Sequence, residues 1–252
     1  MNSINERKDF FILSAPRSGS TVLTQTLDKH PKIFCAGELF NASGNIYHPE
    51  WRFPLFNTAQ KKPATFFSLM NYIKANFSGA SHIKKFYEEK EKEICGFKLM
   101  INHANNFPAV YRYLHSNNFR MIALIRTNVF LQALSGLRAQ QLGIYHSKEE
   151  LKPAEKKYFV NTSLLKKRMG ELEKAKDEVL RLSKSFKSII IKYEDFENWQ
   201  PTLDKIFEFL DVEKMNISPQ LKKISTGNWQ ANVENYNEVE NMIKEDFCNY
   251  IS

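Results

Sequence analysis

The segment "FFILSAPRSGSTVL", residues 10–23, decides the fold. Its first four residues are apolar, which is typical of a short buried strand. A proline, an arginine, a glycine and three hydroxyl residues follow, and apolar residues then resume at helical spacing. A turn between a strand and a helix lies where the helix presents unpaired N–H groups and the positive end of its dipole. We therefore predict that the turn around Arg17 and Gly19 binds an anion.

The rest of the chain continues this alternation of strand and helix. Short apolar runs predict further buried strands at residues 32–35, 94–99, 121–125 and 188–192. Helical periodicity appears at residues 21–29, 108–116, 128–140, 163–185, 202–210 and 236–243. Such a chain is expected to be an α/β protein with a P-loop-like core, in which helices flank a central parallel sheet. We expect one domain over residues 1–252, with loops and short helices between residues 41 and 80.

Composition and charge narrow the classes of function. The 252 residues are 42% apolar and 25% charged, as in a soluble globular protein, and no apolar run approaches the roughly 18–20 residues of a membrane span. The start of the chain lacks a signal-peptide pattern, and Cys35, Cys95 and Cys248 are widely spaced, so we expect a cytoplasmic protein. The net charge of +8 favours an anionic ligand. Because the lysines are spread and no nucleic-acid-binding motif is visible, a small anionic molecule is favoured over nucleic acid.

The turn after the first strand departs from the loop of magnesium-dependent nucleotide kinases. That loop follows G-x-x-x-x-G-K-[ST], in which the lysine contacts the phosphates and the hydroxyl binds magnesium. The sequence "SAPRSGST" does not match this pattern, so the lysine on the phosphates and the hydroxyl on magnesium are both unassigned. We therefore predict no metal at this site, and a nucleotide or small-molecule kinase remains the alternative.

Several segments together resemble sulfotransferases that use 3′-phosphoadenosine 5′-phosphosulfate (PAPS). They are "PRSGST", "LDKHPKIFCAGELF", "GFKLMINH", "IALIRTNVFLQALSGLRA", "IIIKYEDF" and "KKISTGNWQANVENYNEV". The resemblance is closest to bacterial carbohydrate-type and tyrosylprotein-type enzymes. It implies direct in-line transfer of a sulfuryl group from PAPS to a hydroxyl of a carbohydrate or glycolipid. The partners it implies are a small-molecule or glycan acceptor, no nucleic acid, and transient membrane contact where the acceptor is lipid-linked.

The resemblance also assigns the donor-binding residues. The cradle for the 5′-phosphosulfate would be Arg17, Ser18, Gly19, Ser20 and Thr21. Arg126 and Ser135 would bind the 3′-phosphate, although a surface salt bridge also explains an arginine at that place. A loop with Lys222, Lys223 and Gly227 would close over the nucleotide, and a solvated lysine pair is the alternative. Tyr193 would lie near the adenine or else pack in the core.

The general base is open between two residues. The cytosolic small-molecule enzymes have a histidine two residues after a lysine, but Met100 stands at that place after Lys98. The resemblance instead assigns the proton to Glu38, and we expect burial to raise its pKa. His103 is the second candidate, or a residue of the acceptor site. Lys98 would stabilise charge on the bridging oxygen. Residues 41–80 and 141–162 are expected to select the acceptor.

Overall fold

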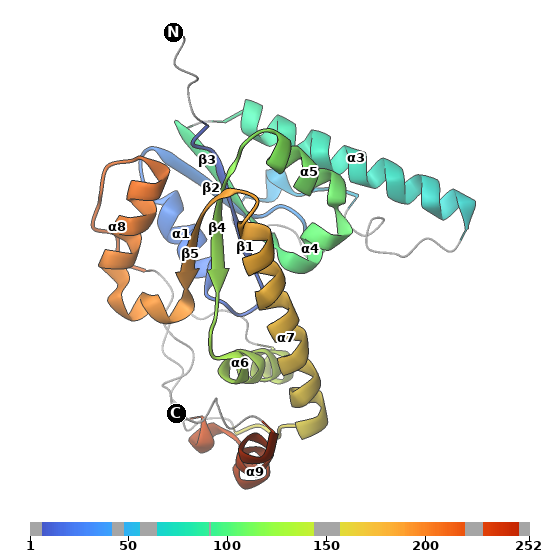
Figure 1. The fold of residues 1–252 in the computed structure, drawn as a ribbon, viewed down its shortest axis with the longest axis vertical. Coiled ribbons are helices and arrows are strands. Elements are labelled where there is room, and N and C mark those ends of the chain that lie inside the picture. The colour runs from blue at the N-terminus through green and yellow to red at the C-terminus, as the bar shows by residue number, and fades with distance from the viewer. Residues whose placement is uncertain are drawn as a thin grey trace.

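The computed structural model describes residues 7–41, 48–55, 65–90, 92–143, 157–219 and 229–246. Its centre is a five-stranded sheet in the order β2-β3-β1-β4-β5, and every neighbouring pair is parallel (Figure 1). The strands are β1 (Phe10–Ser14), β2 (Ile33–Glu38), β3 (Ile94–Met100), β4 (Arg120–Ile125) and β5 (Lys187–Lys192). The α/β prediction with a parallel central sheet is therefore confirmed.

Helices cover both faces of the sheet (Figure 1). Successive side chains of a strand point to opposite faces, so β1 contributes to two cores. Phe11 and Leu13 pack with α3, α4, α5 and α7, whereas Phe10 and Ile12 pack with α1 and α8. A third apolar cluster joins α6, α7 and α9 beyond the sheet. The helices are α1 (Ser20–Asp28), α3 (Phe66–Glu88), α4 (Ile101–Asn106), α5 (Pro108–Ser116), α6 (Val129–Leu142), α7 (Thr162–Ser183), α8 (Trp199–Leu210) and α9 (Tyr236–Asp246).

Each predicted strand is present within one or two residues of its expected start. The reason is burial: all residues of β1, β3 and β4 are buried, as expected for parallel strands covered on both faces. Such strands form continuous apolar runs that are visible in the sequence. The single-domain organisation stays a prediction.

The interpretation of residues 41–80 was wrong in its second half. Helix α3 is 23 residues long and begins inside this stretch, after a capping box between Thr65 and Ser68. In its first part, the core contacts come through small or polar residues, including Ala75, Asn76 and Gly79, and the large apolar residues are exposed. Large apolar residues reach the core only toward its end, at Ile83, Phe86 and Tyr87. Because the apolar residues of the first part do not mark the buried face, helical periodicity does not reveal where this helix begins.

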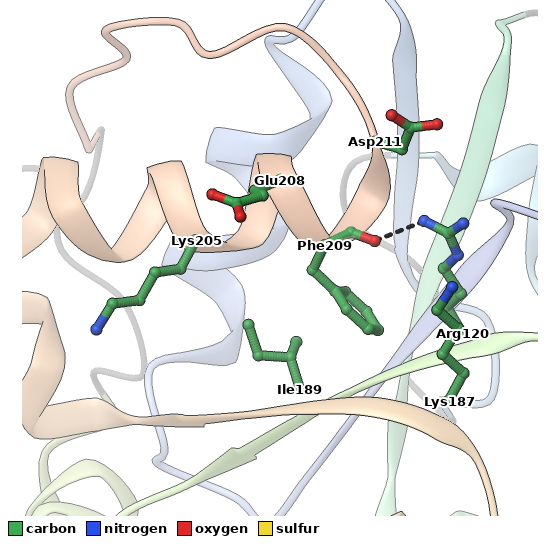
Figure 2. A pocket seen from close by; sticks show the side chains of 7 residues that line it. All are labelled: Arg120, Lys187, Ile189, Lys205, Glu208, Phe209 and Asp211. Carbon is green, nitrogen blue, oxygen red and sulfur yellow. Dashed lines mark hydrogen bonds between the residues drawn. The ribbon is translucent and has the colours of Figure 1, made fainter.

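All five parallel strands begin at one edge of the sheet, which we call the amino edge, and end at the other, the carboxyl edge. These two edges carry different features. At the amino edge, a hollow of about 590 Å³ lies where β4 and β5 begin (Figure 2). Its lining is Arg120, Lys187, Ile189, Lys205, Glu208, Phe209 and Asp211. The carboxyl edge carries the Arg17 turn. Among the described residues, no helix is long and apolar enough to cross a membrane.

Candidate active site

The turn that leaves β1 has an unusual backbone. Arg17 has φ +63° and Gly19 has φ +81°, so both adopt the left-handed conformation. For a non-glycine residue this conformation is uncommon and costs about 1–3 kcal/mol, which the surrounding contacts must offset. Ser18 is buried and its Oγ donates to Ala15 O at 2.8 Å. No side chain caps the amino end of α1, which begins at Ser20, so the turn can present backbone N–H groups to an anion.

Gly19 is required by the packing around it. A Cβ atom at this position would lie 2.7 Å from Tyr193 Cδ2 and 2.8 Å from Phe196 Cε2. The space that a Cβ would take is filled by these two rings, so the absent side chain serves the contact between the turn and the segment after β5.

Helix α6 fixes the position of the turn. Arg17 Nε donates to Ser135 Oγ at 3.2 Å, and Gln132 Nε2 donates to Pro16 O at 2.6 Å. Arg126, which follows β4, donates from Nη1 to Arg17 O at 3.3 Å. The two residues predicted to share the 3′-phosphate, Arg126 and Ser135, therefore both contact Arg17.

Arg126 lies in a largely buried position beside Tyr193. Its guanidinium carbon is 4.3 Å from the centre of the Tyr193 ring, and burial lowers its pKa. Its Nε is buried and makes no hydrogen bond within the part of the chain that the structure describes. Glu194 accepts from the backbone N–H groups of Thr127 and Asn128 at 3.1–3.2 Å, which fixes the approach to α6. Arg126 thus places a charged guanidinium group at the carboxyl edge of the sheet, and its Nε–H donor makes no hydrogen bond among the described residues.

An ion pair joins β2 and β3 next to the turn. Lys98 Nζ lies 2.6 Å from Glu38 Oε1, and it donates to Thr21 Oγ1 at 3.2 Å. The two residues are partners across the neighbouring strands, beyond an irregularity in the register that includes Gly37. The second oxygen of Glu38 accepts from Asn41 Nδ2 at 2.8 Å. Lys98 is buried, and this pair links the proposed base directly to the first turn of α1.

The pKa of Glu38 is shifted in the opposite direction to the one expected from the sequence. Burial by itself raises the pKa of this carboxyl, as predicted. The charge and hydrogen bond of Lys98 act in the opposite sense and prevail, with help from His103 and Asn41, so the net pKa lies below its usual value. The expectation of a raised pKa was therefore wrong for this state of the site, because it omitted the partner on the adjacent strand.

His103 is neutral at physiological pH. It is buried on α4, and burial lowers its pKa to about 4, a shift that the charge of Glu38 opposes and that of Lys98 reinforces. A general base is most effective when its pKa lies near the working pH. Both candidate bases are therefore weak here, Glu38 because of its ion pair and His103 because of its burial.

The predicted residues gather at one edge of the sheet as far as the structure describes them. Arg17 and Thr21 of the turn contact Ser135 and Lys98, while Arg126 and Tyr193 lie beside them. Lys222, Lys223 and Gly227 lie outside the described residues. Sequence reasoning missed Gln132, Asn41 and Glu194, which position the turn, the base and the entry to α6.

The described residues include no group of three or more histidine, cysteine or acidic side chains arranged to bind a metal ion. The absence of a metal in the reaction stays a prediction.

Comparison with known proteins identifies the family. Comparison with curated proteins gives no match. A crystal structure of a sulfotransferase from Alicyclobacillus acidocaldarius aligns with 97% of this chain and 96% of its own, at 12% identity and a TM-score of 0.47. The model of the sulfotransferase family matches residues 9–216, well over half of the chain. The protein therefore belongs to the sulfotransferase family.

Proposed function

We propose that the protein transfers a sulfuryl group from PAPS to a hydroxyl of a carbohydrate or glycolipid acceptor. The observation that carries the proposal is the chain from Glu38 through Lys98 to Thr21, with distances of 2.6 and 3.2 Å. It connects the Glu38 carboxylate with a buried cation and with a helix amino end suited to bind an anion. The acceptor class rests on the resemblance of the sequence motifs. The proposed cytoplasmic location rests on the wide spacing of the three cysteines.

The residues at the carboxyl edge fit a donor with two separate anionic groups. Arg17, Thr21 and the uncapped start of α1 would hold the 5′-phosphosulfate, and Arg126 with its unused buried Nε would hold the 3′-phosphate. Charge-assisted hydrogen bonds of this kind are roughly twice as strong as neutral ones. The donor supplies an activated sulfuryl group on a phosphate leaving group. Tyr193, held against Gly19 and Arg126, is placed to contact the nucleoside.

Lys98 connects donor binding to the basicity of Glu38. An anion beside Thr21 competes with the Glu38 carboxylate for the Lys98 ammonium. When Lys98 turns toward that anion, the interaction that lowers the pKa of Glu38 weakens and the effect of burial remains. Glu38 Oε1, freed from Lys98, then accepts the proton of the acceptor hydroxyl. The same lysine stabilises the charge that develops on the leaving oxygen.

His103 has a different part in this scheme. A neutral imidazole offers one N–H donor and one acceptor nitrogen, which suits it to orient an acceptor hydroxyl. With a pKa of about 4, it is a poor base in the present arrangement. It remains the second candidate for the base, and the comparison of variants given in the Discussion separates the two.

The direct test is a screen of hydroxyl acceptors with radiolabelled PAPS, in which glycans, glycolipids and phenols are compared. We expect label transfer to a carbohydrate-containing acceptor, undiminished by excess EDTA. Loss of activity in EDTA with recovery on adding magnesium, or transfer of phosphate from ATP to the same acceptors, would favour the kinase alternative. Transfer to phenols with no transfer to any glycan would refute the proposed acceptor class. Nucleic acid that copurifies with the protein, read from the 260/280 absorbance ratio, would favour the nucleic-acid alternative.

A further inference from the structure

The first half of α3 exposes large apolar side chains to solvent. Phe66, Phe67 and Phe77 are 79%, 75% and 64% exposed. Leu69, Met70 and Ile73 are exposed as well. We call these six residues the apolar arm. In Figure 1 this half of α3 is the cyan end that projects past the rest of the domain. Single exposed apolar residues are ordinary, but a contiguous group marks an interaction site.

The arm is held by a well-anchored helix. On the opposite side of α3, Ala75, Asn76 and Gly79 are set against the domain, and Gly79 leaves only 3.2 Å between an added Cβ and the side chains of Phe107 and Val110. The hydroxyl of Tyr72 donates to Asn106 O at 3.4 Å, which ties α3 to α4. The helix therefore already has its core contacts, and the arm points away from them. The exposed apolar residues of the arm are therefore not needed for the folding of the domain.

The charge of α3 indicates which kind of partner the arm would bind. From Phe66 to Tyr87 the helix carries Lys74, Lys84 and Lys85 and no aspartate or glutamate. Lys84 and Lys85 form ion pairs with Glu88 and Glu89 at the far end. Lys74 thus adds positive charge beside the arm, in a chain whose net charge is +8. An apolar helix face flanked by lysine and free of acidic residues is complementary to an anionic lipid surface.

The shape of the arm suits a bilayer surface. All six residues lie on one face of a single helix, within its first 12 residues, and this part of α3 projects past the domain (Figure 1). Insertion of one helix face among lipid headgroups needs no matched surface on a partner, whereas a stable protein interface buries about 800 Å² of complementary surface on each side.

We propose that the apolar arm of α3 binds the surface of membranes that contain anionic lipids, with Phe66, Phe67 and Phe77 inserted among the headgroups. The helix lies on the membrane and does not cross it, since no described helix meets the requirement for a span. The proposal rests on exposure and charge and is independent of the proposed sulfuryl transfer.

The test is co-sedimentation of the full chain with vesicles. One set is phosphatidylcholine alone and the other is an equimolar mixture of phosphatidylcholine and phosphatidylglycerol. We expect binding to the mixed vesicles, reduced roughly tenfold or more by the triple change Phe66→Ala, Phe67→Ala and Phe77→Ala. Lys74→Glu should also weaken binding to the mixed vesicles. The matched control is Phe159→Ala, which removes an exposed phenylalanine elsewhere on the chain and should leave binding unchanged.

The variants alter exposed side chains, so each is expected to unfold at the wild-type temperature, and this is measured first. Equal binding of the triple variant and the wild type, or equal binding to the two kinds of vesicle, would overturn the proposal. Sedimentation equilibrium gives the competing outcome. A wild-type dimer that becomes a monomer in the triple variant would show that the arm is instead an interface between copies. Because none of these measurements uses PAPS, their result does not depend on the catalytic assignment.

Discussion

The two edges of the same sheet both gather cationic side chains, but with different consequences. At the amino edge, Arg120 donates to Phe209 O beside the hollow (Figure 2). Lys8 and Lys214 form ion pairs with Asp211 and Glu208 at the same edge. The left-handed backbone of Asp211 is that of an ordinary helix end, since this residue follows α8.

At the carboxyl edge, arginine side chains and a left-handed residue are instead arranged in a way that suits anion binding. Arg17 is left-handed in a turn from strand to helix, where no helix end explains it, and Arg126 keeps a buried N–H without a hydrogen bond among the described residues. The left-handed turn at Arg17 and the uncapped start of α1, rather than an unused donor or a hollow lined by cations, therefore distinguish the candidate anion site. Predictions that contrast the two edges test this conclusion.

The largest effect is expected for Glu38→Gln. This change keeps the shape of the side chain but removes its ability to take a proton, so turnover should fall about 10²–10⁴-fold. The loss should appear in kcat more than in the KM for the donor, because the interaction strengthens in the transition state. His103→Asn should have a smaller effect. Glu208→Gln, at the amino edge, is the control and should keep full turnover. Near-wild-type kcat for Glu38→Gln together with an inactive His103→Asn would assign the base to the histidine.

Burial of His103 predicts a dependence of stability on pH. Its pKa is about 4 in the folded protein against 6.5 in the unfolded chain, so the unfolded state binds more protons between these values. The free energy of unfolding should decrease as pH falls from 6.5 to 4, by about 3 kcal/mol in total from this residue. The lowered pKa of Glu38 acts in the same sense below its usual value of 4.5. Denaturant titrations at pH 7 and pH 5 should show a smaller decrease for His103→Asn, and an identical decrease would refute the burial effect.

Arg126 should determine preference for a 3′-phosphate. We expect the wild type to bind 3′,5′-ADP about ten- to a hundredfold more tightly than 5′-AMP, the value of one charge-assisted contact of about 1.5–3 kcal/mol. Arg126→Ala should remove most of that preference, as isothermal titration calorimetry would measure. Lys205→Ala, at the hollow of the amino edge, should preserve it. If both variants keep the preference, the 3′-phosphate site lies elsewhere.

Gly19→Ala should destabilise the fold more than Gly143→Ala does. Both glycines have positive φ, so the two changes share the cost of a left-handed alanine, about 1 kcal/mol. At Gly143 no atom lies within 4 Å of the new Cβ, whereas at Gly19 the rings of Tyr193 and Phe196 lie within 2.8 Å. We expect a further loss of about 1–3 kcal/mol at Gly19. Thermal unfolding of the two variants measures the difference, and equal losses would mean that the rings move aside freely.

The sequence by itself determined the alternating strands and helices and the place of the anion-binding turn. The reason is that parallel strands such as β1 and β4 are buried on both faces and must be apolar throughout, so their signal is local. A turn between such a strand and a helix has its chemistry in consecutive residues. The family and the candidate residues around Arg17 follow from the same local pattern.

The tertiary structure decided what each of these residues contacts. Lys98 meets Glu38 because β2 and β3 are neighbours in register, and this contact reverses the shift in the pKa of Glu38 that burial would cause. Ser135 pairs with Arg17 across 118 positions of sequence. The exposure of the apolar arm depends on which face of α3 meets the domain. Pairings between distant segments and the burial of one helix face follow from packing, which is a property of the whole chain and has no local pattern in the sequence.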